Sequence, residues 1–401
     1  MAAATGLRGV VRDLLVGSKK IFILGLLVLL GLAFAVSGLA ASPIRIGATV
    51  SLSGKYQEPS AMMAEACKLW EKQVNDRGGL LGRPVRLILY DDQSKEEQVR
   101  RLYQKLIVAD KVDLVLSPYS TTLTLPASEI TEKHRFVLVS GGASGESVWE
   151  RDYQYVFGVH APAKRYFIGF LDLMARHGLE TVNILYENSA FQKSVAQGAR
   201  EWASRLGLKV VLYKVYNQGK AELPGLVKEV MAAPADGLIF CSYPNDSYEL
   251  LRLLKETPYR PQALCLTIAA SYPGFGEKMG DAAEGVFAPS QWEADTRMPF
   301  PGTQEFIENY KALTNRLPSY HAGSAYAACQ ILEKAIKATR SLSQDKIRDY
   351  IRSLDTVTII GRFRVDETGK QIGHNPILIQ WQKGKKEIVY PLNLQTATPK
   401  F

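Results

Sequence analysis

Apolar and polar positions follow two different periods in the first part of the chain. Residues 44–50 are a short apolar run bounded by turn residues, which predicts a buried strand. After the polar loop 51–59, apolar side chains recur at helical spacing through residues 60–75, until glycines and a proline interrupt the pattern at 76–84. A second apolar run at 85–90 completes a β-α-β unit. In sheets of such units, ligands bind beyond the carboxyl ends of the strands.

The same alternation continues through most of the chain. Further strands are predicted at 112–117, 136–140, 155–159, 181–186, 209–216, 237–241, 262–266 and 286–289, and near the end at 358–365 and 376–388, the last with a turn at Gly384. Helices are predicted at 96–108, 124–134, 165–177, 191–206, 223–233, 247–256, 301–316, 323–339 and 343–354. A stretch around Ala161 separates two β-α series of similar size. We therefore expect an α/β protein of two lobes, each built on a doubly wound parallel sheet.

Composition and charge are ordinary for a globular protein. The chain has 401 residues, of which 46% are hydrophobic and 22% charged, and its length suits two lobes. The net charge of +9 is spread along the sequence, and residues 383–386 hold the one basic cluster beyond the N-terminal segment. This mild basicity does not resemble the basic patch of a nucleic-acid-binding protein.

Residues 1–42 have the pattern of a targeting segment. Four basic residues precede an uncharged apolar run at 21–36, and small residues follow it at 37–42. This order is typical of a signal peptide cleaved near Ala40 or Ala41. The alternative is an uncleaved N-terminal membrane anchor, since residues 21–40 are about long enough to span a bilayer. Both interpretations place the globular part outside the cytoplasm, in the periplasm or an equivalent compartment.

The spacing of the cysteines and histidines does not predict a metal site. Cys67, Cys241, Cys265 and Cys329 lack zinc-site spacing, and the five histidines are dispersed. Cys241 and Cys265 belong to successive predicted strands and could pair in an exported protein. Buried free thiols are the preferred interpretation for all four.

Motifs of enzymes are missing or fail on spacing. The sequence has no G-x-G-x-x-G after a strand and no phosphate-binding G-x-x-x-x-G-K-[ST], and residues 142–145 do not meet the G-x-S-x-G spacing of a nucleophile elbow. Asp91 and Asp92 are interpreted as caps of the next helix rather than as an acid–base pair, and Ser94 with Glu97 as a capping box. We therefore expect no enzymatic activity, no cofactor and no metal.

Two loops have the chemistry of a carboxylate site. Residues 117–122 and 140–144 each follow a predicted strand and combine small residues, hydroxyl groups and free backbone N–H groups. Glycine-rich turns and helix N-termini hold carboxylates through such groups. The alternative is that these hydroxyls only cap helices.

Several motifs resemble the leucine/isoleucine/valine-binding protein family, the type I periplasmic binding proteins of ABC importers. The resemblance is carried by S-L-S-G at 51–54, N-D-R-G-G-L-L-G-R-P-V at 75–85 and Y-D-D-Q-S at 90–94. It continues more weakly to about Lys383. It implies three crossings between the lobes, near Ala161, Ala288 and Arg362. The first lobe would be 43–160 plus 289–361 and the second 161–288 plus 362–401.

The resemblance also implies a ligand site. It places the carboxylate-binding groups at Ser120 and Thr121 in the first loop and at Gly142, Ala143 and Ser144 in the second. Around the ligand it places Tyr56, Gln57, Phe191 and Tyr243, and Trp292 with Gln291 beside the cleft.

One departure from the family affects the expected ligand. Amino-acid receptors of this family commonly have an acid after the strand that matches 263–266, where it pairs with the ligand ammonium. Residues 267–270 contain no acid here, and a buried ammonium without a partner is costly. Asp246 and Glu187 remain as possible substitutes.

The resemblance therefore implies a monomeric extracytoplasmic receptor that closes two lobes on a small-molecule ligand and delivers it to the membrane subunits of an ABC importer. The ligand is expected to be a branched-chain or related amino acid. The alternatives are a small aromatic or aliphatic acid or amide, and a ligand sensor in place of a transport protein.

Overall fold

The computed structural model describes residues 42–219 and 221–401. The predicted signal peptide or anchor lies outside the described residues, except for Ser42. Within the described ranges, no helix has the length and apolar character needed to cross a membrane.

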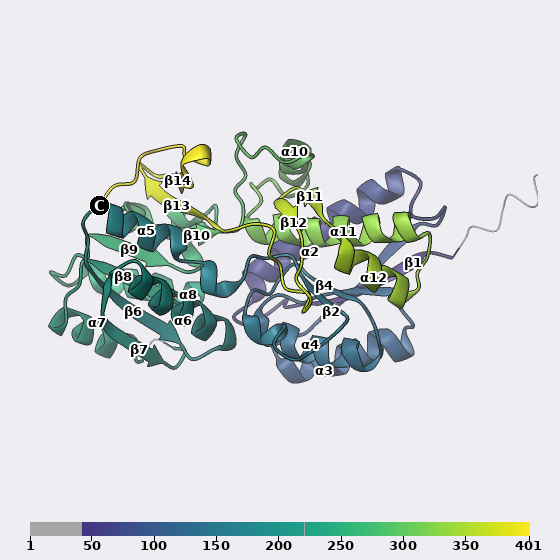
Figure 1. Ribbon diagram of the computed structural model, residues 1–401, viewed down its shortest axis with the longest axis horizontal. Coiled ribbons are helices and arrows are strands. Elements are labelled where there is room, and N and C mark those ends of the chain that lie inside the picture. Colours follow the sequence, from purple (N-terminus) through teal and green to yellow (C-terminus); the bar gives the residue numbers. More distant parts are fainter. Residues whose placement is uncertain (1–41, 220) are drawn as a thin grey trace, which may run out of the picture.

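The first lobe is built on a five-stranded parallel sheet covered by helices on both faces (Figure 1). Its strand order is β2-β1-β3-β4-β5, with β1 at Ile44–Val50, β2 at Val85–Asp91, β3 at Leu114–Leu116, β4 at Leu138–Ser140 and β5 at Val156–Gly158. Helices α2 (Gln57–Asp76), α11 (Tyr320–Thr339) and α12 (Gln344–Ser353) lie on one side, and α3 (Glu96–Gln104) and α4 (Thr121–Lys133) on the other. Helix α10 (Thr303–Thr314) packs on α2.

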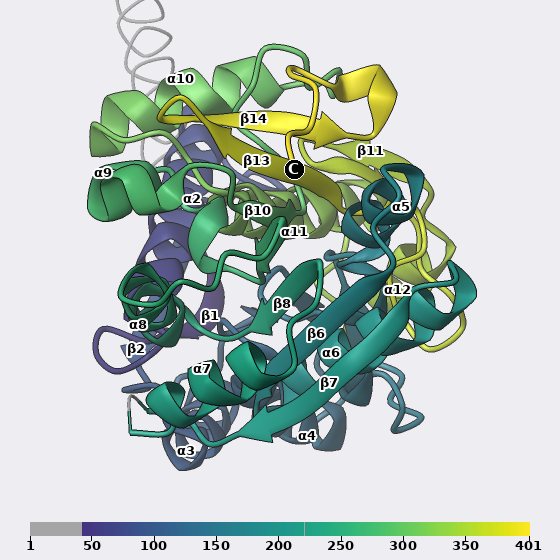
Figure 2. The ribbon, with the colours of Figure 1, turned by 90° about the vertical axis from the view of Figure 1, so that its left-hand side faces the viewer.

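The second lobe contains a seven-stranded sheet of order β14-β13-β10-β9-β8-β6-β7, seen in Figure 2 with β14 and β13 together at one edge. Its strands are β6 (Thr181–Glu187), β7 (Lys209–Tyr216), β8 (Gly237–Cys241), β9 (Ala263–Leu266), β10 (Phe287–Ser290), β13 (Ile377–Gln382) and β14 (Lys385–Tyr390). Its helices are α5 (Ile168–Arg176), α6 (Ala190–Arg205), α7 (Leu223–Ala232), α8 (Pro244–Lys255) and α9 (Phe275–Met279). The prediction of two α/β lobes is confirmed. This sheet is mixed rather than parallel, since β13 runs antiparallel to both neighbours.

Three segments join the two sheets. The first runs from β5 to helix α5, and the second leaves β10 toward α10. The predicted boundary at 288/289 falls inside β10, whose last residue, Ser290, still pairs with Ile377 of the second sheet. The third segment crosses later than Arg362. The N–H of Gly158 in β5 donates to Gly369, so the chain remains against the first lobe beyond the hairpin of β11 (Thr356–Thr358) and β12 (Gly361–Phe363).

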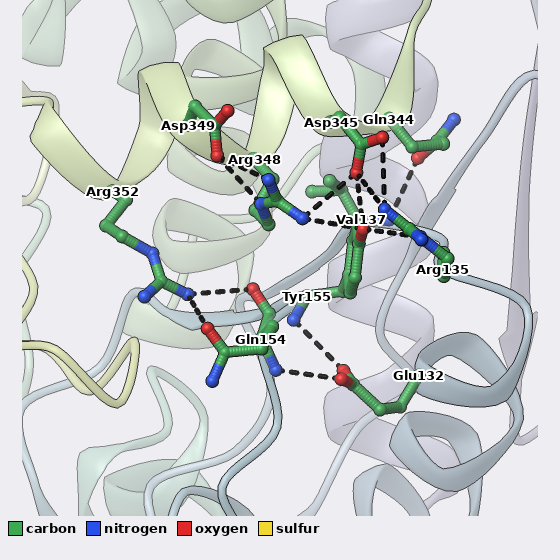
Figure 3. A network of polar contacts seen from close by, with 10 residues as sticks. All are labelled: Glu132, Arg135, Val137, Gln154, Tyr155, Gln344, Asp345, Arg348, Asp349 and Arg352. Atoms are coloured by element: carbon green, nitrogen blue, oxygen red, sulfur yellow. Dashed lines mark hydrogen bonds and ion pairs between the residues drawn. The ribbon is translucent and has the colours of Figure 1, made fainter.

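A polar network attaches α12 to the edge of the first sheet (Figure 3). Its centre is the Tyr155 hydroxyl, which donates to Asp345 and accepts from Arg135 at 2.9 Å and Arg348 at 2.6 Å. The ring of Tyr155 is buried. Around it, Arg352 donates to Gln154, Glu132 accepts from the backbone of residues 154 and 155, and Gln344 accepts from the backbone of Val137.

The acidic pair after β2 stabilises a loop and does not cap a helix. Helix α3 has Lys95 at its N-cap position without a side-chain cap, so the predicted capping box is wrong. Asp92 is buried and accepts from the Thr49 and Ser51 hydroxyls at 2.7 and 2.6 Å. Ser94 donates to the carbonyl of Ser53 at 2.7 Å. These bonds fix loop 51–56, which leads into α2.

Candidate functional site

The candidate site lies between the lobes, where the carboxyl ends of the parallel strands of both sheets face one another. The first lobe contributes the loops after β3 and β4, and the second contributes the loops after β6 and β8. The cavity between them is nearly filled by side chains and has a volume of about 10 Å³, so a ligand can enter only when the two lobes move apart. Its lining consists of Tyr119, Ser120, Thr121, Gly142, Ser144, His160, Tyr166, Phe191, Tyr243 and Tyr320.

Ser120 occupies a strained backbone conformation at the start of α4. Its φ of 78° and ψ of 149° lie in a region that non-glycine residues rarely adopt. The strain is maintained by two hydrogen bonds, one from its N–H to the carbonyl of Gly142 at 2.9 Å and one from the N–H of Leu123 to its hydroxyl at 3.1 Å. Such outliers persist where the surrounding structure requires them, often at binding sites. Here the conformation sets the N-terminal amides of α4 at the edge of the cavity.

The second loop packs tightly against the first. A Cβ on Gly142 would stand 2.4 Å from the carbonyl oxygen of Pro118, so only glycine permits this approach. The Thr121 hydroxyl accepts from the N–H of Gly145 at 2.9 Å and keeps its own proton to donate. The two loops therefore form one rigid wall with donors for an anion.

Ser144 links two aromatic residues of the first crossing. Its hydroxyl lies 3.0 Å from Nδ1 of His160 and 2.8 Å from the Tyr166 hydroxyl. Burial lowers the pKa of His160 to about 3, so the ring is neutral. Burial also raises the pKa of Tyr166 to about 12. When Nδ1 of His160 accepts from Ser144, Nε2 carries the proton and becomes a donor.

Aromatic rings form the rest of the site and meet across the two lobes. Tyr56 packs edge-on against Tyr243 of the second lobe, with ring centroids 5.0 Å apart, and against Tyr119 at 5.7 Å. Tyr166 meets Phe191 at 5.3 Å. All five side chains are buried. A ligand here would lie between ring faces and edges, an environment suited to a flat apolar body.

An ion pair also connects the lobes beside these rings. Nζ of Lys55, on the first loop, lies 3.4 Å from Oε1 of Glu187 at the end of β6 and 5.2 Å from the ring centroid of Tyr243. Glu187 is 1% exposed. Burial raises the pKa of Glu187, an effect that Lys55 partly offsets. We call this pair the Lys55–Glu187 latch.

Several polar atoms in and around the cavity are buried and have no hydrogen-bond partner among the residues that the structure describes. They are the hydroxyls of Tyr56 and Tyr243, Nε2 of His160 and Oε2 of Glu187. Buried polar atoms normally have partners, and an unpaired one costs free energy. Their position around the cavity is typical of a site completed by a polar ligand or by water.

The structure brings together six of the ten residues that the sequence suggested as ligand contacts. Ser120, Thr121, Gly142, Ser144, Phe191 and Tyr243 line the cavity. Tyr56 contacts Tyr243 directly behind it. The remaining three lie elsewhere.

Gln57 lines a separate hollow with Lys55 and Asp246. Ala143 is buried outside the cavity lining, and Trp292 packs against Phe306 and α11. Gln291 connects the first and second of the segments that join the lobes, because its Oε1 accepts a hydrogen bond from the N–H of Ala161 at 2.9 Å.

Sequence reasoning missed four lining residues, Tyr119, His160, Tyr166 and Tyr320. Tyr119 was within the loop already selected. The other three flank the first crossing or begin α11. Only the fold places them beside that loop, although His160 and Tyr166 lie on either side of the predicted linker.

Neither proposed substitute for the missing acid is free. Asp246 accepts from the Tyr216 hydroxyl at 3.1 Å and the N–H of Gly219 at 3.3 Å, outside the cavity lining. Glu187 pairs with Lys55. None of the described residues that line the cavity is acidic. In the described ranges, no group of three or more His, Cys, Asp or Glu side chains is arranged to hold a metal ion.

Two α/β lobes joined by three segments, with a lined cavity between them, define a two-lobed solute-binding protein. Comparison with known proteins agrees. The periplasmic binding protein family model matches residues 43–386, so the chain belongs to the periplasmic binding protein family. Proteins of this family are extracytoplasmic and bind substrates.

The individual relatives resemble this chain at low sequence identity. A Leu/Ile/Val-binding protein homolog from Brucella abortus is 26% identical over 389 residues, covering 90% of this chain and 94% of its own. The structure resembles the branched-chain amino acid binding protein LivJ of Streptococcus pneumoniae in complex with isoleucine, with a TM-score of 0.78, 18% identity and coverage of 87% and 100% of the two chains. It also resembles a solute-binding protein of Rhodopseudomonas palustris in complex with 3,4-dihydroxybenzoic acid, with a TM-score of 0.77, 19% identity and coverage of 86% and 95%. These structural likenesses support the fold.

Proposed function

We propose that this protein is the receptor of an ABC importer and binds a small carboxylate without an amine, preferably an aromatic acid, between its closing lobes. The observation that carries the proposal is the lining of the cavity. It offers the hydroxyl donors of Ser120 and Thr121 and Nε2 of His160 for an anion, and aromatic rings for an apolar body, but none of the described residues that line it is acidic. An ammonium group placed there would lose its hydration without gaining a carboxylate partner.

The relatives include receptors for both ligand classes. The proteins in complex with isoleucine and with 3,4-dihydroxybenzoic acid share this fold at similar TM-scores. The fold therefore accommodates either ligand, and the side chains of the cavity decide between them.

A branched-chain amino acid is the second candidate. It is favoured by Glu187, whose Oε2 is buried without a partner at the end of β6. An ammonium group that displaced Lys55 would find a carboxylate there.

Calorimetric titration of four compounds separates the two candidates: leucine, phenylalanine, and their des-amino analogues 4-methylpentanoate and 3-phenylpropanoate. We expect 3-phenylpropanoate to bind at least tenfold more tightly than phenylalanine, because unpaired burial of an ammonium costs more than 1.4 kcal/mol. Tighter binding of the amino acids would overturn the proposed ligand class and favour Glu187 as the ammonium partner. Ligand-dependent uptake in a strain with and without the protein tests the transport role.

The same proposal includes export through the N-terminal segment. We propose that residues 1–42 direct export and that the mature chain begins near Ala41 or Ser42. N-terminal sequencing of protein recovered from an exporting host checks this. Recovery of the intact segment in the membrane fraction would favour the anchor instead.

A further inference from the structure

Two cysteines that are distant in sequence touch inside the first lobe. Sγ of Cys67 in α2 and Sγ of Cys329 in α11 lie 3.7 Å apart, although 262 positions separate them. Both thiols are free, and their side chains are 8% and 0% exposed. From the sequence, Cys241 and Cys265 were the pair that could lie close, and buried free thiols were the preferred interpretation for all four cysteines.

The two helices approach closely enough for a covalent bond. Small residues, among them Ala322, Ala325 and Ala328, form much of the buried surface of α11. Packed helix axes lie about 8–10 Å apart, and the Cα atoms lie about 2.3 Å from each axis. Facing Cα atoms are then about 3.4–5.4 Å apart, which overlaps the range of disulfides. A small cavity of about 20 Å³ is lined by Cys67 and Ala328, so the Cys67 side chain borders free space.

Cys241 and Cys265, in the second lobe, do not lie close enough for a disulfide bond. Cys265 of β9 pairs with Ile239 of β8, so Cys241 lies two positions further along the neighbouring strand. With strands about 4.8 Å apart and a rise of about 3.3 Å per residue, their Cα atoms are about 8 Å apart. This exceeds the limit of about 7 Å for a bridge.

We propose that Cys67 and Cys329 form a disulfide bond in the exported protein. The family is extracytoplasmic, and such compartments permit disulfides. A disulfide of an oxidising protein supplies the oxidant. One thiol, as thiolate, attacks this disulfide and forms a mixed disulfide, and the second thiolate displaces the reduced oxidant. The new S–S bond forms, the oxidant's S–S bond breaks, and the two protons lost by Cys67 and Cys329 pass to the oxidant's sulfurs, which end as two thiols. Because both thiols are buried in the folded lobe, the exchange takes place before α2 and α11 have packed.

The bond would connect two helices that carry residues of the ligand site. Tyr56 immediately precedes α2, and Tyr320 is the first residue of α11. The disulfide therefore fixes the spacing of two aromatic side chains on the first-lobe side of the cleft. This role does not depend on which ligand the cleft binds.

The test is a peptide map of protein exported by its host and purified without reductant. Free thiols are blocked with N-ethylmaleimide under denaturing conditions before digestion. We expect the Cys67 and Cys329 peptides to be linked, with a mass 2 Da below their sum, and Cys241 and Cys265 to be fully blocked. Blocking of all four cysteines would overturn the proposal, as would a link between any other pair.

A thermal measurement provides an independent test. Reduction of the parent protein should lower the melting temperature by about 5–10 °C, because the bond closes a long loop that runs through both lobes. The double variant Cys67→Ala/Cys329→Ala should not respond to reductant. The matched variant Cys241→Ala/Cys265→Ala should respond like the parent. If that matched variant loses the response and the first one keeps it, the disulfide is elsewhere.

Discussion

At the residue scale, the hydroxyl of Thr121 is the most direct test of the carboxylate-binding loops. It accepts from Gly145 and has one proton left to donate toward the cavity. Thr121→Ala should weaken binding of a carboxylate ligand such as 3-phenylpropanoate by about 1.5–3 kcal/mol, the usual contribution of a hydrogen bond to a charged group. This corresponds to roughly ten- to a hundredfold in Kd, measured by calorimetry.

Thr121→Ser is the matched control, because it keeps the hydroxyl and removes only a methyl group. Its affinity should stay within about threefold of the parent, less than the effect of a lost hydrogen bond. Since Thr121→Ala also leaves the N–H of Gly145 without its acceptor, thermal unfolding of both variants shows whether the loop is intact. Equal affinities of the Ala and Ser variants would mean that the hydroxyl does not contact the ligand.

Residues of the first-lobe loops were predictable from sequence because strand ends rich in glycine and hydroxyl groups are local signals. The backbone strain at Ser120 was not predictable, because it depends on the hydrogen bond from the N–H of Ser120 to the carbonyl of Gly142 in another loop. Tyr320 was also missed. It begins a helix 176 residues after Ser144, the last residue of the predicted carboxylate loops, and only the sheet order brings that helix to the cleft.

At the element scale, α12 depends on the Tyr155 hydroxyl for its attachment to the sheet edge. This hydroxyl donates to Asp345 and accepts from two arginines. Tyr155→Phe should therefore lower the free energy of unfolding by about 1–2 kcal/mol, since the buried ring stays and only the hydrogen bonds are lost. Urea unfolding at neutral pH measures the change.

Ligand affinity provides the internal control for Tyr155→Phe. The α12 network lies on the first lobe away from the cavity lining, so the Kd should remain unchanged. A stability equal to that of the parent would show that the network contributes nothing, as many exposed ion pairs do.

Most elements were predicted from periodicity, and the errors have local causes. Helix α4 begins at Thr121, three residues before its predicted start, because Ser120 caps it and Pro126 is accepted inside it. The predicted strand at 358–365 is a hairpin that reverses between Thr358 and Gly361. Apolar residues at 359–360 concealed this turn, since periodicity alone does not distinguish a buried turn from a strand.

At the scale of the whole molecule, the Lys55–Glu187 latch joins the two lobes. Lys55→Met would leave Glu187 buried without its cation, and removing one partner of a buried pair is destabilising. Because Lys55 is partly exposed to solvent, this destabilisation is smaller than for a fully buried pair. We expect ligand affinity to fall about five- to thirtyfold, mainly through faster dissociation, because the loss falls on the closed form. Stopped-flow fluorescence measures the dissociation rate.

Glu187→Gln completes a double-mutant cycle with Lys55→Met. If the latch acts as a pair, the double variant should bind better than Lys55→Met alone, because no unpaired charge remains. Small-angle scattering should show ligand-induced compaction in the parent and less in Lys55→Met. Additive effects of the two substitutions on affinity would mean that the residues act independently.

Two neutral histidines couple the stability of the interface to pH. Burial lowers the pKa of His160 to about 3. Burial is also the main cause that lowers the pKa of His321 well below its ordinary value. His160 contacts Ser144 and Tyr320, and His321 contacts Tyr119, Tyr272 and Tyr320. None of these groups carries a negative charge at neutral pH. Lys386 further disfavours a charge on His321.

Acidification should therefore destabilise the folded protein between about pH 6.5 and 5.5. In this range the unfolded chain protonates both histidines near their ordinary pKa of about 6.5 while the folded protein does not, so the unfolded state binds more protons. The expected loss at pH 5.5 relative to pH 7.5 is about 1.4 kcal/mol for each of these two histidines, and His374, whose pKa burial lowers to about 4, adds a loss of the same sign. Urea unfolding at pH 7.5, 6.5 and 5.5 measures the total, and His321→Gln should reduce it by about 1.4 kcal/mol. Burial raises the pKa of five carboxyl groups, those of Glu58, Asp92, Glu146, Glu187 and Glu293, and their effect on stability has the opposite sign. Equal stability at pH 7.5 and 5.5 would show that the histidines become charged within the folded protein, and therefore that the interface opens to water on acidification.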